Sequence, residues 1–265
     1  MDRRCLILTF ALGMALPVAR AGERPKLRVL TYNIHHGEGS DERLDLARIA
    51  RIIRHAEPHL VALQEIDNKT RRTNHVDQAA ELARLTDLRA AFGKAIDYQG
   101  GQYGNAILSR WELRDVKTHA LPHVPKREAR CALAATVTPG GGLPNLLFVS
   151  THLQNGPKAI KDRIRQAKRL NQLLVNDDDI PTIVAGDLNA VPFDPSFRLL
   201  ASHWLNASGV NPPATCPADQ PRWPIDHVLL RPATRWRIAG VTVLEEPVAS
   251  DHRPLLVVLE WLGEP

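Results

Sequence analysis

Short apolar runs alternate with amphipathic segments from Lys26 almost to the end of this 265-residue chain. Runs such as KLRVLTYNI, HLVALQEI and TIVAGDLNA have the length and composition of buried strands. Residues 44–57 instead place Leu46, Ile49 and Ile53 on one face of a helix. No repeat or low-complexity linker interrupts the pattern. We therefore expect one α/β domain with two packed mixed sheets covered by helices, rather than a single doubly wound sheet.

The remaining elements follow from the same periodicities. A helix is expected after Asp77, which is a good N-cap, and the longest helix is expected over residues 157–175, opened by a proline. The segment 209–224 is a proline-rich loop. Further strands are expected at 104–109, 113–121, 131–137, 145–153, 225–231, 236–246 and 255–261.

The N-terminus has the layout of a secretory signal peptide. Two arginines precede an apolar stretch over residues 5–18, and the small-residue pattern Ala-Arg-Ala follows at 19–21. The apolar stretch is too short to span a bilayer comfortably, which disfavours the alternative of an uncleaved anchor. We expect a signal peptide over 1–21, a folded domain over 22–265, and a periplasmic or secreted protein.

Charge and cysteine content set two further limits. Removal of residues 1–21 lowers the formal net charge from +5 to +3, because that segment carries three arginines and one aspartate. This mild excess is compatible with an anionic substrate without indicating nucleic-acid binding. Only Cys131 and Cys216 remain, so the exported chain holds at most one internal disulfide. A buried free thiol is the favoured alternative for Cys131, which lies in an apolar run.

Polar side chains recur where the apolar runs end, and ligands bind at such strand ends in α/β proteins. Two of them, Asp187 and Asn189, are two residues apart, so in an extended chain they would point the same way. The set is Asn33, Glu65, His152, Asp187, Asn189, Asp226, Asp251 and His252.

These residue types indicate a metal-assisted acid–base site. Asn33 and Glu65 offer oxygen ligands suited to Mg²⁺ or Mn²⁺. Asp226 is placed to accept a hydrogen bond from His252 and hold the tautomer that takes a proton from water, and His152 would serve the leaving group. Five other histidines are expected on the surface or in loops: His35, His36, His75, His119 and His123.

The motifs TYNIHHG, LQEID, YGNAILSR, STHL, GDLNA, IDHVLL and SDHRPL occur in the order seen in the endonuclease/exonuclease/phosphatase superfamily. The chain resembles this superfamily, which includes pancreatic-type deoxyribonuclease and bacterial sphingomyelinase, from about Lys26 to Glu260. The resemblance implies a four-layer α/β sandwich and metal-dependent cleavage of phosphoester bonds. It also implies that Glu65 is the principal metal ligand, with Asn33 and Asp251 completing its polar surroundings.

The same resemblance implies roles for the other site residues. Asp187 and Asn189 would orient the attacking water and hold the phosphate, and His252, paired to Asp226, would be the general base. His152 would assist the leaving group. The substrate contacts would be Arg72, Tyr103, Asn105 and Arg130. Two alternatives stay open: Arg130 forms a surface ion pair with Glu128, or Arg72 and its neighbour Arg71 are solvated loop residues.

The expected function is an exported Mg²⁺- or Mn²⁺-dependent phosphoester hydrolase of the phosphodiesterase or nuclease type. Its substrate would be a nucleic acid, a phospholipid headgroup or a small phosphodiester. A lipid-headgroup phosphodiesterase resembling sphingomyelinase is one alternative, and a catalytically silent phosphate-binding module is another. No obligate protein partner is expected, and the chain is expected to be a monomer.

Overall fold

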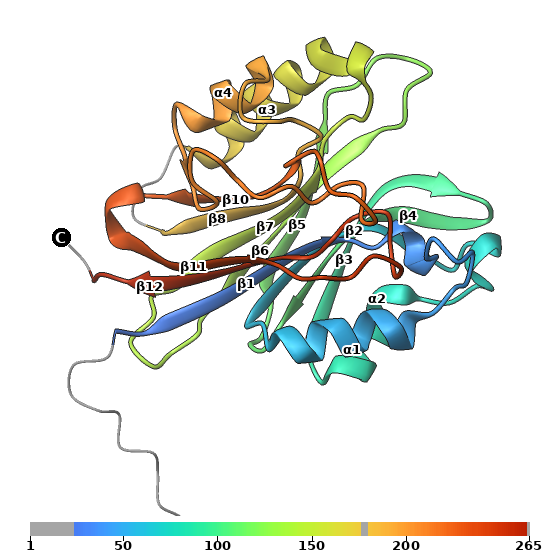
Figure 1. The fold of residues 1–265 in the computed structure, drawn as a ribbon, viewed down its shortest axis with the longest axis horizontal. Coiled ribbons are helices and arrows are strands. Elements are labelled where there is room, and N and C mark those ends of the chain that lie inside the picture. The colour runs from blue at the N-terminus through green and yellow to red at the C-terminus, as the bar shows by residue number, and fades with distance from the viewer. Residues whose placement is uncertain (1–23, 176–179, 264–265) are drawn as a thin grey trace, which may run out of the picture.

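A computed structural model describes residues 24–175 and 180–263. The expected signal peptide lies outside these residues. The chain forms two six-stranded sheets packed face to face with helices on both outer faces, giving the four layers seen in Figure 1. The predicted α/β fold with two packed mixed sheets is therefore confirmed.

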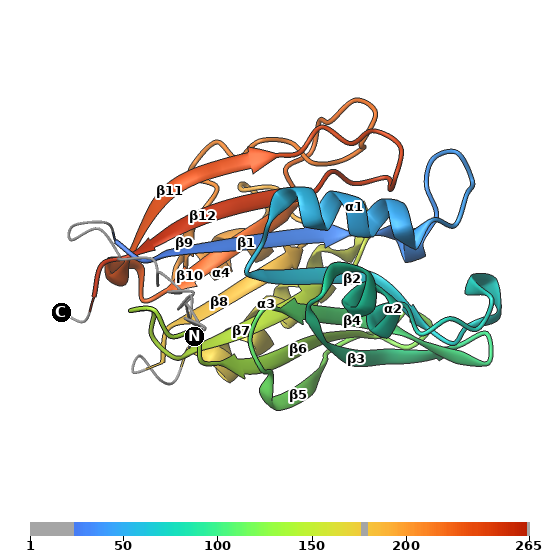
Figure 2. The same ribbon diagram turned by 90° about the horizontal axis from the view of Figure 1, so that it is seen from below.

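The first sheet contains the N-terminal and C-terminal strands. Its members are β1 (Lys26–Asn33), β2 (Leu60–Asn68), β3 (Arg89–Tyr98), β4 (Gly101–Ser109), β11 (Trp236–Val243) and β12 (Leu255–Trp261). They lie in the order β11-β12-β1-β2-β4-β3, which Figure 2 shows from top to bottom. β1 is parallel to β2 and antiparallel to β12, so the sheet is mixed.

The second sheet comes from the middle of the chain. Its members are β5 (Arg114–Leu121), β6 (Arg130–Val137), β7 (Leu146–His152), β8 (Thr182–Asp187), β9 (Leu205–Asn206) and β10 (Asp226–Arg231). They lie in the order β5-β6-β7-β8-β10-β9, with β7 parallel to β8 and β8 antiparallel to β10. β1 and β2 face β8 and β7 across the interface, so the centres of the two sheets meet.

Apolar side chains fill the space between the sheets and under the helices. Leu60, Ile107, Phe148 and Val228 belong to the inter-sheet core. Each fully buried side chain of this kind contributes about 1.5–3 kcal/mol to the stability of the fold. Separate clusters lie beneath the helices on each outer face.

Two helices cover each outer face. They are α1 (Leu46–Ala56) and α2 (Gln78–Thr86) beside the first sheet, and α3 (Ile160–Leu174) and α4 (Pro195–Ala201) beside the second. The Asp77 carboxylate accepts from the backbone N of Ala80, as expected for an N-cap. Short 3₁₀ turns occur at η1 (His35–Gly37), η2 (Arg71–Thr73), η3 (Pro157–Ala159) and η4 (Ala233–Arg235).

Several elements differ from the sequence expectation, among them the two-residue strand β9, which was not expected. β3 was not predicted, because charged residues and Gly93 interrupt its alternation and it is an edge strand. The short helix α4, capped by Asp194, was not predicted either. The helix expected over 157–175 begins as the 3₁₀ turn η3 and becomes α-helical at Ile160.

Both cysteines in the described part of the chain are free thiols, and Cys131 is buried as favoured above. Burial raises the pKa of the Cys131 thiol to about 12. Among the described residues, none of the helices has the length and apolar character needed to cross a bilayer.

Candidate functional site

Strand ends from both sheets bring polar residues to one edge of the sandwich. In the second sheet, Asp187 at the end of β8 lies opposite His152 of β7 and Asp226 of β10. In the first sheet, Asn33 ends β1 and pairs in register with Gln64 of β2. Because the two sheets are packed face to face, these ends meet. A regular hydrogen-bond ladder therefore places three of the predicted site residues together.

Asn33 joins the two halves of this site. Its Nδ2 donates to Glu65 Oε1 at 3.0 Å and to Asp187 Oδ2 at 3.2 Å. Asp187 Oδ2 in turn lies 3.7 Å from His252 Nε2. Glu65 and His252 therefore belong to one continuous polar network, although they are far apart in the sequence.

The Asp226–His252 pair has the geometry of an oriented base. His252 Nδ1 lies 2.8 Å from Asp226 Oδ2, and that oxygen also accepts from Thr215 Oγ1 at 2.6 Å. Since Nδ1 donates to a carboxylate, Nε2 is the ring nitrogen directed toward Asp187 and able to exchange a proton. The carboxylates of Asp187 and Asp226 and the His252 imidazole also form a group able to hold a metal ion.

Burial and charge act in opposite directions on these groups. Burial lowers the pKa of His252, but the nearby carboxylates of Asp226 and Asp187 outweigh it and raise that pKa well above the usual value. Burial raises the pKa of Asp187, but the imidazoles of His252 and His152 lower it by more. The net effect is a pKa below the usual value. The site thus favours a charged carboxylate beside a strongly basic imidazole.

Asp187 and Asn189 converge by a turn, not by strand alternation. β8 ends at Asp187, and Asn189 has a left-handed backbone with φ 48°. The backbone N of Asn189 donates to Asp187 Oδ1 at 2.8 Å, and its Nδ2 donates to Leu153 O at 3.1 Å. The expectation that the two side chains face one point is met, but its assumed cause, an extended chain, is wrong.

His152 is held between a cation and a carboxylate. Arg130 Nη1 lies 3.0 Å from His152 Nδ1, and His152 Nε2 lies 3.3 Å from Asp187 Oδ2. A guanidinium can only donate, so Nδ1 accepts and the ring proton is on Nε2. Arg130 also pairs with Glu128 at 2.7 Å, so the ion pair weighed as the alternative is present, and it joins a guanidinium that is 7% exposed to a carboxylate side chain that is 38% exposed.

Glu65 reaches the site through an irregularity in its strand. The register between β2 and β4 shifts between Leu63 and Ile66, and Glu65 has φ 59°. Such a bulge re-aims the side chain at a stored cost in backbone strain. Burial raises the pKa of Glu65, but the electrostatic interaction with the His152 ring and the hydrogen bond from Asn33 outweigh it, and the pKa is lowered.

Two histidines beside Glu65 were assigned to the surface or loops by sequence reasoning. His35 and His36 lie in η1 directly after β1, and with Glu65 they form a second group able to hold a metal ion. His36 is 7% exposed and is therefore not on the surface, although it does lie in the connection between β1 and α1. Their position in the motif TYNIHHG, separated from Asn33 only by Ile34, was the available signal.

Two predicted site residues are not brought into these groups. Asp251 is exposed and is absent from both metal-capable groups among the described residues. Asn105 is buried, and its Nδ2 donates to the Cys131 carbonyl at 3.0 Å, so its contacts support the β6 backbone and give no evidence for phosphate binding. The predicted roles of both residues remain untested.

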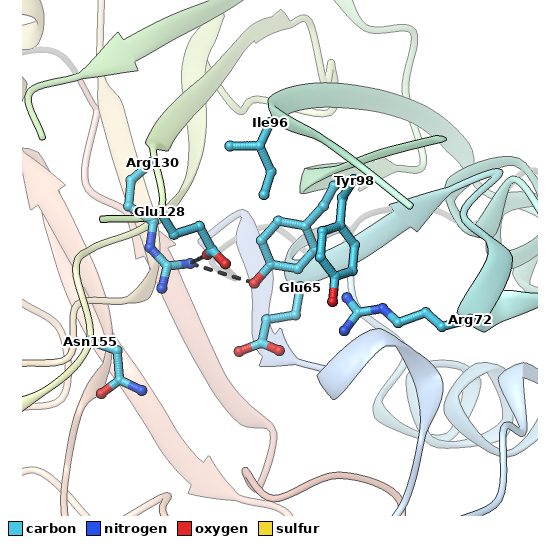
Figure 3. Close-up of a pocket in the computed structure, with 8 residues that line it drawn as sticks. Glu65, Arg72, Ile96, Tyr98, Glu128, Arg130 and Asn155 are labelled. Atoms are coloured by element: carbon cyan, nitrogen blue, oxygen red, sulfur yellow. Dashed lines mark hydrogen bonds and ion pairs between the residues drawn. The ribbon is translucent and has the colours of Figure 1, made fainter. Parts of the chain in front are cut away.

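The other three predicted substrate contacts line one cavity of about 250 Å³ beside Glu65. Arg72 and Arg130 approach it from opposite sides in Figure 3, with Glu65 and Tyr98 between them. Tyr103 also lines this cavity, and burial followed by the charge of Glu65 raises its pKa well above the usual value. Arg71 is exposed, whereas Arg72 is half-buried.

Comparisons with known proteins find relatives of this chain in sequence and in fold. YbhP of Escherichia coli K12 is 25% identical over an alignment 253 positions long, which covers 86% of this chain and 94% of YbhP. A solved endonuclease/exonuclease/phosphatase from Beutenbergia cavernae DSM 12333 is 26% identical with a TM-score of 0.73, covering 92% of this chain and 73% of that one. The human Nocturnin catalytic domain with bound sulfate anion has the same fold at 20% identity and a TM-score of 0.73, covering 89% of this chain and 94% of that one. Residues 30–252 match the family described as Endonuclease/Exonuclease/phosphatase, and the chain belongs to that family.

Proposed function

We propose that this protein is a phosphoester hydrolase that uses a divalent cation, Mg²⁺ or Mn²⁺. The observation that carries the proposal is the network in which Asn33 joins Glu65 to Asp187, next to the Asp226–His252 pair. Membership of the endonuclease/exonuclease/phosphatase family supports the same reaction class.

In the proposed reaction, His252 Nε2 accepts a proton from the attacking water. Asp226 fixes the imidazole from the other side through Nδ1 and stabilises the imidazolium that forms. Asp187 faces both imidazoles, since its Oδ2 lies 3.3 Å from His152 Nε2 and 3.7 Å from His252 Nε2. His152 Nε2–H is then placed to donate to a phosphate oxygen or to the leaving group.

The donor chemistry of the site fits a divalent cation. Glu65 would hold it, and the imidazoles of His35 and His36 lie close enough to contribute. When bound, the ion would neutralise charge on the phosphoryl oxygens. Oxygen ligands suit Mg²⁺, and additional imidazole ligands would favour Mn²⁺ over Mg²⁺.

Chelation tests the metal requirement. We expect EDTA to abolish hydrolysis of bis-p-nitrophenyl phosphate and p-nitrophenyl phosphate, and Mg²⁺ or Mn²⁺ to restore it. Glu65→Gln should reduce kcat by several orders of magnitude, whereas Glu81→Gln, which changes a partly exposed helix carboxylate paired with Arg84, should not. Activity that survives chelation would contradict the metal requirement. Absence of hydrolysis in the unmodified protein would favour the silent binding module instead.

The natural substrate belongs to the same proposal. A nuclease would need an extended basic groove with exposed stacking aromatics. A sphingomyelinase-like enzyme would need an exposed apolar hairpin, and the loop 209–224 is polar and proline-rich. A panel of plasmid DNA, RNA, sphingomyelin, phosphatidylinositol and bis-p-nitrophenyl phosphate would separate these classes by the product released.

We also propose that residues 1–21 direct export and that the mature protein works as a monomer. The basic start, the short apolar stretch and the Ala-Arg-Ala triplet support export. N-terminal sequencing of protein recovered from the cell exterior or periplasm should give a chain beginning at Gly22. Light scattering on that protein should give a mass near that of one chain.

A further inference from the structure

The cavity beside Glu65 is small and almost entirely polar. It is lined by Arg72, Tyr98, Tyr103, Glu128, Arg130, Asn155, Ile96 and Glu65 itself. Its volume of about 250 Å³ falls below the usual range for drug-sized ligands and suits one small chemical group. Because Glu65 belongs to both, the cavity adjoins the proposed reaction centre, where the alcohol part of a phosphoester would lie.

Arg72 is fixed in place at this cavity. Its Nε and Nη2 donate to the two carboxylate oxygens of buried Asp67, at 2.7 and 2.9 Å. Asp67 is itself held by Thr70 Oγ1 at 2.6 Å. Within residues 24–175 and 180–263, Arg72 Nη1 makes no hydrogen bond, so it remains available to a ligand. This bidentate pair gives the guanidinium a defined direction.

The aromatic walls of the cavity are already occupied by this guanidinium. Arg72 Cζ lies 4.7 Å from the Tyr98 ring centroid and 5.6 Å from that of Tyr103. Tyr103 is only 6% exposed, so it offers no open face, and Tyr98, which is 36% exposed, already has the guanidinium over its ring. A quaternary ammonium or a nucleobase binds by covering such faces. The cavity is therefore poorly built for choline or a base.

The cavity is lined by both hydrogen-bond donors and hydrogen-bond acceptors. Arg130 is buried beside Glu128, and its Nε has no hydrogen-bond partner in the described part of the chain. Glu128 has a side chain 38% exposed and supplies a carboxylate, while Asn155 supplies an amide with both functions. A second anionic group would meet the arginines but also Glu128. A hydroxyl both donates and accepts, so it suits this mixed lining.

We infer that the cavity binds a hydroxyl-rich alcohol group, of the sugar or polyol type, and thereby selects phosphoesters of such alcohols. The inference rests on the proposed function, because it assigns the substrate class of the same site. Arg72 would donate through Nη1, and Glu128 would accept from a substrate hydroxyl. Both would act on specificity and not on the chemical step.

Competitive inhibition tests this assignment for monoesterase and diesterase alike. Glucose 6-phosphate, phosphocholine and thymidine 5′-monophosphate would each be tested as inhibitors of the hydrolysis of bis-p-nitrophenyl phosphate or, for a monoesterase, of p-nitrophenyl phosphate. We expect the inhibition constant of glucose 6-phosphate to be lower than the other two by at least about tenfold, because most of its ring carbons carry hydroxyls, whereas phosphocholine has no free hydroxyl and thymidine 5′-monophosphate has a single one. Equal inhibition by the three compounds, tighter inhibition by phosphocholine or the nucleotide, or no inhibition would overturn the inference.

Two variants locate the effect in the cavity. Arg72→Lys keeps the charge but loses the planar fork, so the inhibition constant of glucose 6-phosphate should rise by about tenfold and that of phosphocholine should stay unchanged. Glu128→Gln, at a partly exposed position, should raise the constant for glucose 6-phosphate by about fivefold through loss of an acceptor. Arg71→Lys is the matched control and should change neither.

The outcomes separate the two proposals. If Arg72→Lys does not fold, as judged by circular dichroism, Glu128→Gln decides the question. An equal loss of affinity for all three inhibitors in the deciding variant would overturn the inference and leave the hydrolase intact. Failure of the unmodified protein to hydrolyse the reference compound would overturn the proposed function, and the inference would fall with it.

Discussion

The two halves of the site are built in different ways. Asp187 and Asp226 lie opposite one another in a regular antiparallel ladder, and His152 joins them through a regular parallel one. Glu65 instead lies at a register shift with φ 59°, next to η1, where His35 and His36 have φ of 45° and 44°. The first half is positioned by sheet geometry and the second by local strain, which places functional groups where a regular strand could not.

The largest expected effect falls on His252, which lies outside the ladder, in the bend before β12, and pairs with Asp226 of the ladder. His252→Ala should lower kcat on bis-p-nitrophenyl phosphate by about 100- to 10,000-fold, because it removes the proposed base. Steady-state kinetics with a circular dichroism check of folding would measure this. His75→Ala, at an exposed loop histidine, is the control. A loss of less than tenfold would mean that His252 is not the base and that the catalytic role lies with Glu65 and its neighbours.

The ladder between β7 and β8 should not tolerate a side chain at Gly186. A Cβ on Gly186 would lie 1.9 Å from the carbonyl oxygen of Thr151 on the neighbouring strand. Gly186→Ala should therefore lower the free energy of unfolding by about 3 kcal/mol, measured by urea titration. Gly240→Ala is matched, since its added Cβ would meet nothing closer than 3.9 Å, and it should cost less than about 1 kcal/mol. Equal costs would show that β8 can move without disturbing the site.

A smaller effect concerns the pH dependence of kcat that the Asp226–His252 pair sets. Asp226 raises the pKa of His252, and a base works only when deprotonated, so activity should rise with pH through that raised pKa. Asp226→Asn lowers the pKa of His252. The rising limb of the pH–kcat profile should then move to lower pH while the maximal rate falls by about tenfold or more. If the rising limb does not move, it does not report the ionisation of His252.

The smallest effect concerns strain in the other half. Glu65→Gly should abolish activity yet raise the free energy of unfolding by up to about 1 kcal/mol, because glycine tolerates a positive φ. Lys69→Gly is the control for strain alone, since Lys69 is exposed and also has φ 59°. A net destabilisation in Glu65→Gly alone would mean that the buried carboxylate, and not strain, dominates the energetics at this position.

Much of the fold and part of the site were predictable from local patterns. Apolar runs mark most strands, and a polar residue at the end of each marks the edge where the site forms. The Asp226–His252 hydrogen bond was predicted from residue types and is present at 2.8 Å. β3 was missed because an edge strand lacks a continuous apolar face, and with it the contribution of Tyr98 to the cavity was missed.

Other parts of the site depend on contacts that no local pattern contains. Asn105 looked like a phosphate contact, but its amide meets the Cys131 carbonyl only because β4 and β6 face each other across the two sheets. His36 is buried because Gln78 of α2 donates to its carbonyl and closes over η1. Asp251 is exposed although its neighbour His252 is buried.

The sequence by itself determined the family, the strand and helix pattern and the types of side chain that the site uses, because these depend on the order and spacing of residues along one chain. The tertiary structure decided which of those side chains meet. Convergence of Glu65 with His252, and of Arg72 with the two tyrosine rings, requires a bulge, a sheet register and packing between sheets. These are set by the summed packing of distant segments, and that sum is not encoded in any single stretch.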